Sequence, residues 1–299
     1  MKKYFYLHLI TFYLLGNSYT SVFAQWSTAT LSRGRQWIAS ASVSNKALFA
    51  GGYYYTSNYF IVSSDQVDIY DGTLDQWSSS TLSVGRSGIG STSTDSLAFF
   101  AGGRMFINNG SIPTQQSLAR VDIYNGHTNQ WSTGELSEPR ADVVGANAMG
   151  KVLFAGGDNS RAVDIYDVST KQWSISQLPQ LSGTGLCATS LGNKIYFVKN
   201  GLLDIYDVVS GQWTMATYPQ TTLSVGCISS DTKAFFAGGR DANTANAANQ
   251  VNIYDQSNSQ WTISSLSQAR SSIATTKTSG KLFLQVGIFQ TYLRIIRTC

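Results

Sequence analysis

The feature that most constrains this chain is a short sequence element of which six copies are spaced 40–54 residues apart. The dipeptide Gln-Trp recurs at intervals of 51, 54, 42, 40 and 48 residues. Its tryptophans are Trp26, Trp77, Trp131, Trp173, Trp213 and Trp261. A repeat of this length indicates one supersecondary unit per period, and each unit must stack on its neighbours to bury its apolar surface.

Two further elements come before these tryptophans in a fixed order. One reads Val-Asp-Ile-Tyr or a close variant, and its tyrosines are Tyr70, Tyr124, Tyr166, Tyr206 and Tyr254. The other is an apolar run that ends in two glycines, at Gly51, Gly52, Gly102, Gly103, Gly156, Gly157, Gly238 and Gly239. Alternation with a period of two predicts a strand, and paired glycines allow the positive φ that ends one.

Each repeat therefore predicts four short strands. The first is rich in small residues, as in 87–93 and 271–276, which suits a strand crowded against its copies. The apolar run is the second, the Val-Asp-Ile-Tyr element is the third, and the fourth begins at tryptophan. Turn residues such as Asp71-Gly72 separate the third strand from the fourth. Because a four-stranded sheet has two apolar faces, several such sheets must pack together.

This order of Gly-Gly, tyrosine and tryptophan at a period near 50 resembles the kelch repeat, and the resemblance covers residues 25–299. It implies an all-β fold, a propeller of four-stranded antiparallel blades with aromatic rings between them. It carries little about function, since kelch propellers serve as enzymes, adaptors and lectin-like binders. Galactose oxidase has such repeats, but its copper site needs histidines and a tyrosine crosslinked to cysteine. His127 alone cannot supply these ligands, so we expect no metal and no cofactor.

The two ends of the repeat region complement each other. After Trp261 the chain supplies a first strand over 271–276 and a second over 281–287. Leu293-Arg294-Ile295-Ile296 then falls where a third strand belongs, and no fourth strand follows. The region begins with Gln25-Trp26, a fourth-strand element with no strands before it. We therefore expect a six-bladed β-propeller whose last blade is closed by the N-terminal strand.

The first 24 residues have the pattern of a signal peptide. Lys2 and Lys3 precede an uncharged apolar stretch, and Val22-Phe23-Ala24 has small residues suited to cleavage. The stretch is shorter than the ~20 residues that span a bilayer. We expect a secreted protein whose single domain is residues 25–299, without a membrane span. Without Lys2 and Lys3 it has 19 Lys and Arg against 17 acidic residues, which does not favour nucleic-acid binding.

Arginines recur at two positions of the repeat. Arg35, Arg86, Arg140 and Arg270 lie where one repeat leads into the next, and Arg104 and Arg240 directly follow a Gly-Gly pair. A meander of four strands places both sets on one face, with the loops 53–66, 104–120 and 240–250. One interpretation is a basic pocket for a carboxylate, because guanidinium binds carboxylates bidentately. The other is that the arginines pair with acids of their own repeat, such as Asp68, Asp122 and Asp164.

Aromatic residues near this face are less periodic than the arginines. Trp37 is out of phase with the other tryptophans, and Tyr53 and Tyr55 lie in the loop after the first Gly-Gly pair. Residues that do not recur with the repeat are better candidates for a ligand site, because the repeated ones are explained by packing. We therefore expect Trp37, Tyr53 and Tyr55 to contact a ligand.

The sequence favours a non-catalytic module that binds a protein segment or a glycan, with acidic ligands among the candidates. It has no phosphate-binding loop, no Cys-x-x-Cys and no nucleophile elbow. Two alternatives remain open. One is an enzyme acting on acidic sugars, of the sialidase or mutarotase kind, and the other is a purely structural surface protein.

Three cysteines and one sequon complete the motifs. Cys187 and Cys227 occupy equivalent first strands of adjacent repeats. We expect these strands to lie farther apart than the ~7 Å between Cα atoms that a disulfide allows, and the two cysteines to be buried free thiols. Cys299 has no counterpart and is a candidate for intermolecular pairing. Asn109 lies in an Asn-Gly-Ser sequon within a long loop, and we expect it to be glycosylated.

Overall fold

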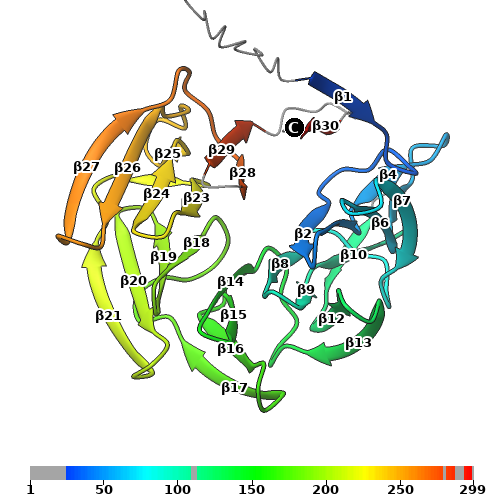
Figure 1. The fold of residues 1–299 in the computed structure, drawn as a ribbon, viewed down its shortest axis with the longest axis horizontal. Coiled ribbons are helices and arrows are strands. Elements are labelled where there is room, and N and C mark those ends of the chain that lie inside the picture. Colours follow the sequence, from blue (N-terminus) through cyan, green and yellow to red (C-terminus); the bar gives the residue numbers. More distant parts are fainter. Residues whose placement is uncertain (1–24, 109–112, 279–280, 287–292, 298–299) are drawn as a thin grey trace, which may run out of the picture. The chain divides into compact units, whose positions relative to one another are not determined.

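Every regular element among the described residues is a β-strand (Figure 1). The computed structural model describes residues 25–108, 113–278, 281–286 and 293–297. The chain divides into two compact units, Ser32–Thr291 and Met1–Leu31 with Tyr292–Cys299. The predicted signal peptide over 1–24, the sequon at Asn109 and the C-terminal Cys299 lie outside the described residues.

The unit Ser32–Thr291 contains five four-stranded antiparallel sheets, named sheets 1 to 5 in chain order. Sheet 1 is β2 (Ala39–Val43), β3 (Lys46–Ala50), β6 (Gln66–Asp71) and β7 (Gln76–Thr81). Sheet 2 is β8 (Gly90–Ser93), β9 (Leu97–Ala101), β12 (Arg120–Asn125) and β13 (Gln130–Glu135). Sheet 3 is β14 (Val144–Ala148), β15 (Lys151–Ala155), β16 (Ala162–Asp167) and β17 (Gln172–Gln177). Sheet 4 is β18 (Cys187–Leu191), β19 (Lys194–Lys199), β20 (Leu202–Asp207) and β21 (Gln212–Thr217). Sheet 5 is β23 (Gly226–Ser229), β24 (Lys233–Ala237), β26 (Gln250–Asp255) and β27 (Gln260–Ser265).

Short hairpins extend the loops between second and third strands. They pair β4 (Tyr53–Tyr55) with β5 (Ile61–Ser63) and β10 (Arg104–Ile107) with β11 (Thr114–Ser117). In sheet 5 the loop strand β25 (Arg240–Asp241) pairs instead with β22 (Thr222–Leu223), which precedes the sheet. These hairpins lie outside the regular repeat and carry several of the candidate ligand residues.

The repeated landmarks occupy equivalent places in all five sheets. The repeat tyrosine of the third strand lies opposite the tryptophan of the fourth, as Tyr70 does opposite Trp77. The ring centroids of these pairs are 4.9–5.3 Å apart. The predicted four-strand unit, with its tyrosine and tryptophan side by side, is therefore confirmed for sheets 1 to 5.

The first strands of successive sheets contact one another in chain order, from β2 through β8, β14, β18 and β23 to β28 (Ile273–Thr278) (Figure 1). Small residues permit this approach. A Cβ atom added to Gly90 would lie 2.5 Å from Val143, and one added to Gly145 would lie 2.8 Å from the Ser91 carbonyl oxygen. The expectation that small side chains mark crowded first strands is confirmed at these positions.

The Gly-Gly turns join each sheet to the segment that enters the next. Gly52 donates its N–H to the Arg86 carbonyl, and Gly103 donates to that of Arg140, both at 2.9 Å. Gly51 has a φ of 66°, and a Cβ atom there would lie 2.5 Å from the same Arg86 oxygen. Glycine is required at this position both for its backbone conformation and for the close approach.

Two further strand pairs lie outside the five complete sheets. β28 pairs with β29 (Lys281–Val286), close to the first and second strands expected there. In the other unit, β1 (Gln25–Ala29) pairs antiparallel with β30 (Leu293–Arg297), and Trp26 lies opposite Ile296. That register matches the tyrosine–tryptophan register of the complete sheets, so the predicted pairing of these two strands is confirmed.

Cys187 and Cys227 form a disulfide that joins β18 of sheet 4 to β23 of sheet 5. Their Cα atoms are 5.9 Å apart, within the range that a disulfide needs. The expectation of two free thiols is therefore wrong. It failed because first strands of adjacent sheets come closer together than the sequence argument assumed.

Removal of this disulfide provides a test of the contact between sheets 4 and 5. We expect the double variant Cys187→Ala, Cys227→Ala to lose up to about 4 kcal/mol of unfolding free energy, because the bond closes a loop of 40 residues. Urea unfolding followed by tryptophan fluorescence measures this change. Addition of a reductant to the unaltered protein should lower the urea midpoint in the same way, and an unchanged midpoint would contradict the assignment.

Candidate functional site

Three of the repeat arginines form buried ion pairs with acids of their own repeat. Arg35 pairs with Asp68 and Arg140 with Asp164. Arg86, whose side chain is fully buried, lies 2.7 Å from Asp122. The sequence left two interpretations open, and these contacts are the ones that the pairing interpretation describes.

The Arg86 pair shows how these groups hold the backbone. Arg86 donates to the carbonyl oxygens of Gly102 at 2.8 Å and Phe100 at 3.0 Å, on the second strand of its sheet. Asp122 accepts a hydrogen bond from the N–H of Ser83 at 3.0 Å, in the segment that enters the sheet. Burial lowers the pKa of Arg86, and the Asp122 carboxylate opposes that change. The pair is part of the core and is not available to a ligand.

The other two arginines make the same contacts. Arg35 donates to the Gly51 carbonyl at 2.8 Å, and Arg140 donates to the Gly156 carbonyl at 2.7 Å. The aspartates Asp68 and Asp164 each accept a backbone N–H from the segment entering the sheet, at 3.2 Å and 2.7 Å. We therefore leave Arg35, Arg86 and Arg140 out of the candidate ligand surface.

Replacement of Arg86 by methionine tests this structural role. We expect Arg86→Met to lose about 3–5 kcal/mol of unfolding free energy, because Asp122 remains buried without its cation. The double variant Arg86→Met, Asp122→Leu should recover part of the loss, since both charges are then absent. Urea unfolding of the two variants measures the difference. Unaltered stability of Arg86→Met would contradict a structural role.

Sheets 4 and 5 lack the repeat arginine. The polar residue on their third strand makes other hydrogen bonds instead. In sheet 4, Asp204 accepts the N–H groups of Gln180 at 3.1 Å and Leu181 at 3.0 Å, and burial raises its pKa. In sheet 5 the aspartate is replaced by Asn252, which donates to the Tyr218 hydroxyl at 2.9 Å. Where the cation is missing, the repeat thus retains a lone carboxylate or a neutral amide.

The isolated Asp204 predicts a pH dependence of stability. Its folded pKa lies above the unfolded value, so the unpaired carboxylate disfavours the folded state increasingly as the pH rises through that folded pKa. We expect Asp204→Asn to gain stability relative to the unaltered protein between about pH 4 and pH 7. Unfolding free energies at several pH values measure this difference, and a constant difference would contradict it.

The two remaining arginines of the predicted set lie elsewhere. Arg270 is partly buried, and its carbonyl oxygen accepts the N–H of Gly239 at 2.9 Å. Arg240 is exposed on β25, opposite Leu223. The structure therefore does not bring these two arginines into contact with the predicted aromatic residues.

Trp37 occupies a position whose backbone is left-handed in every repeat. Two residues after each repeat arginine or its replacement, φ is positive, between 52° and 76°. The six residues at this position are Trp37, Gly88, Asp142, Gly185, Ser224 and Ser272. Glycine, aspartate and serine are small or tolerate this conformation, whereas a bulky side chain there is strained by about 1–3 kcal/mol. Trp37 is nevertheless 55% exposed, so packing does not explain its presence.

Trp37 is one of four aromatic rings that are connected through Tyr53. Its ring centroid lies 6.1 Å from that of Tyr53, which in turn is 5.8 Å from Tyr55 and 5.3 Å from Phe106. All three contacts are edge-to-face, a favourable geometry for aromatic pairs. Tyr53 is fixed by a hydrogen bond from its hydroxyl to the Gln36 side chain at 2.8 Å. The structure therefore brings together the predicted residues Trp37, Tyr53 and Tyr55.

An ion pair borders these rings. Arg104 pairs with Asp142, donates to the Gln115 side chain at 3.1 Å, and lies 6.0 Å from the centroid of the Trp37 ring. Burial raises the pKa of Asp142; Arg104 opposes this change and Asp158 reinforces it. We define the aromatic surface as Trp37, Tyr53, Tyr55 and Phe106 with the Arg104–Asp142 pair.

Three sheets contribute to the aromatic surface. Its residues come from the segment that enters sheet 1, from the loops between the second and third strands of sheets 1 and 2, and from the segment that enters sheet 3. The hairpins of sheets 1 and 2 are joined where Phe106 donates its N–H to the Ser63 hydroxyl at 2.9 Å and Asn108 donates to the Ile61 carbonyl at 2.8 Å. The surface is therefore held in place by backbone contacts between neighbouring hairpins.

Sequence reasoning missed Phe106 and the role of Asp142 at this surface. Phe106 is the third residue after its Gly-Gly pair, as Tyr55 is after the first pair, and this correspondence is the sequence signal that could have marked it. Asp142 occupies the same repeat position as Trp37, two residues after the repeat arginine. Alignment of these positions would have linked the two residues, since Arg104 contacts both.

Further aromatic side chains lie in the same loop of sheet 1. Tyr59 is 87% exposed with a φ of 61°, and Phe60 is also exposed. The Arg33 guanidinium lies 4.2 Å from the centroid of the Tyr54 ring. The exposed aromatic area thus extends from the aromatic surface toward the end of the β4–β5 hairpin.

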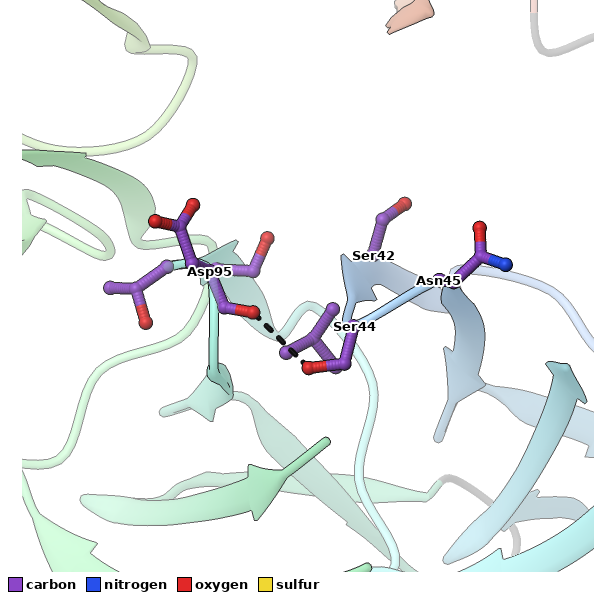
Figure 2. A pocket seen from close by; sticks show the side chains of 7 residues that line it. Ser42, Ser44, Asn45 and Asp95 are labelled. Atoms are coloured by element: carbon purple, nitrogen blue, oxygen red, sulfur yellow. Dashed lines mark hydrogen bonds between the residues drawn. The ribbon is translucent and has the colours of Figure 1, made fainter. Parts of the chain in front are cut away.

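Away from the aromatic surface, a hollow lies between the turns that join first and second strands in sheets 1 and 2. Figure 2 shows its lining by Ser42, Ser44, Asn45 and Asp95, with the Ser44 hydroxyl donating to the Asp95 carbonyl at 3.2 Å. The nearest imidazole nitrogen, that of His127, is 3.5 Å from the Ser44 oxygen, which is too long for proton transfer. This polar hollow contains no activated nucleophile among the described residues.

Comparison with other proteins assigns no family to the chain. Neither the models of known protein families nor the curated proteins match it. In the part of the chain that the structure describes, no cluster of three or more potential ligands could hold a metal ion. No helix of that part has the length and apolar character needed to cross a membrane.

Proposed function

We propose that the chain is a six-bladed kelch-type β-propeller. Sheets 1 to 5 supply five blades, and β28, β29, β30 and β1 supply the strands of the sixth. The repeat order, the common register of the five sheets and the equivalent register of Trp26 with Ile296 support this architecture. The proposal takes the kelch resemblance as the explanation of the repeated landmarks.

We further propose that the protein is an extracellular binding module that presents the aromatic surface to a protein segment or a glycan. The observation that carries this function is Trp37, a strained and exposed indole at a position where the other repeats have glycine, serine or aspartate. Backbone strain that packing does not require is typical of functional sites. The adjoining rings and the Arg104–Asp142 pair supply the mixture of apolar and polar groups that ligand sites use.

The disulfide supports the extracellular location. Disulfides persist in oxidising compartments and are rare where thiols are kept reduced. The bond between Cys187 and Cys227 is buried in the first strands, as a structural disulfide is.

The structure favours binding over the alternative of an enzyme acting on acidic sugars. That chemistry uses arginines to hold the substrate carboxylate. Arg35, Arg86 and Arg140 are buried against aspartates, and Arg104 is paired with Asp142. No specific contact supports a catalytic role for these groups.

Replacement of Trp37 by glycine separates function from stability. Glycine removes the strained side chain, so we expect the thermal midpoint of Trp37→Gly to stay unchanged or rise. The same variant should lose binding to the ligands that the unaltered protein retains on glycan and peptide arrays. Thermal unfolding and array binding measure the two effects.

Ser224→Gly is the matched control for this experiment. It makes the same left-handed position a glycine in sheet 5, outside the aromatic surface, and should leave binding intact. Trp37→Gly with unaltered binding to every retained ligand would contradict the proposed function. The absence of any retained ligand would favour a structural surface protein instead.

A further inference from the structure

We infer that the aromatic surface binds a neutral glycan, with one sugar ring stacked on Trp37 and its hydroxyl groups bound by the Arg104–Asp142 pair. This inference rests on the proposed binding function and specifies its ligand. It is argued from the exposed ring, the polar groups beside it and the balance of charge.

The exposed Trp37 ring supplies an apolar platform. A pyranose ring has one face made mainly of C–H groups, and these pack against the electron-rich face of an aromatic ring. Tyr53 meets Trp37 edge-to-face with an interplanar angle of 68°, which fixes the indole without covering it. Tyr55 is 52% exposed and extends the apolar platform, so that it can contact a second sugar unit of the same oligosaccharide.

Hydrogen-bonding side chains lie beside the Trp37 ring. The Arg104 guanidinium lies 6.0 Å from the Trp37 ring centroid, and the Asp142 carboxylate remains partly exposed beside it. A sugar hydroxyl both donates and accepts, so two adjacent hydroxyls can donate to the carboxylate and accept from the guanidinium. Gln115, which accepts from Arg104, is exposed and supplies a further amide.

The balance of charge favours a neutral ligand. The positive charge of Arg104 is matched by Asp142, and Asp158 adds a second carboxylate that acts on Asp142. The arginines expected to attract an acid, Arg35, Arg86 and Arg140, are enclosed in the core. An acidic sugar would bring its carboxylate toward Asp142 without an unpaired cation from this set to receive it.

The experiment is a titration of the full chain with defined oligosaccharides and peptides. Neutral hexasaccharides of glucose, xylose and mannose are compared with an oligogalacturonate and with the peptides retained on an array. Calorimetry and tryptophan fluorescence measure the dissociation constants. We expect at least one neutral oligosaccharide to bind at least tenfold more tightly than the oligogalacturonate.

Variants locate the binding. Trp37→Gly should weaken the neutral oligosaccharide at least tenfold, Trp37→Phe should retain most of the affinity because a ring face remains, and Ser224→Gly should have no effect. Asp142→Asn should also weaken binding. A carboxylate accepts hydrogen bonds at both oxygens, whereas an amide accepts only at its single oxygen. Thermal unfolding of each variant checks that the fold persists.

The outcomes distinguish this inference from the proposed function. Preference for the oligogalacturonate, or peptide binding that depends on Trp37, overturns the neutral glycan but leaves the binding function standing. The absence of binding to every neutral oligosaccharide at millimolar concentration also overturns the inference. Ligand binding that is indifferent to Trp37→Gly overturns both.

Discussion

The buried arginine–aspartate pair is the interaction that fixes sheets 1 to 3 of the repeated structure. In sheets 1 to 3 the arginine lies in the segment that enters a sheet, contacts the end of its second strand, and pairs with its third strand. One side chain thus fixes three parts of a sheet that are distant in sequence. Two charges removed from water are tolerated only because each has a partner and further hydrogen bonds. The recurrence of the arginine therefore reports a structural requirement, as Arg86 shows most completely.

Sequence periodicity predicted the strands within each repeat. It did not predict contacts that depend on the distance between neighbouring sheets. The four-strand unit and the pairing of β1 with β30 followed from landmarks such as Trp77 and Trp26, because each repeat position has one environment. The disulfide was missed, since the spacing between adjacent first strands depends on how closely small residues such as Gly90 allow them to approach. Similarly, Arg86 was a candidate for binding an acidic ligand, because the sequence could not show that its partner Asp122 lies within its own sheet.

Departures from the repeat were the better guide to the candidate site. Trp37, Tyr53 and Tyr55 were identified because they do not recur, and the structure brings them together with Phe106. Their common environment depends on hairpins that extend beyond the repeat and contact each other, which no periodic pattern encodes. A repeated scaffold thus leaves positions free to vary once its own contacts are satisfied, and the left-handed position held by Trp37 is one of them.

The disulfide lies between the two sheets that lack the arginine. Sheet 4 has Gly183 and sheet 5 has Thr222 at that position, and Cys187 and Cys227 connect these same sheets covalently. Buried ion pairs therefore stabilise sheets 1 to 3, and a disulfide links sheets 4 and 5. Among the described residues, a reductant acts only where sulfur joins sheets 4 and 5, so it leaves the buried ion pairs of sheets 1 to 3 in place.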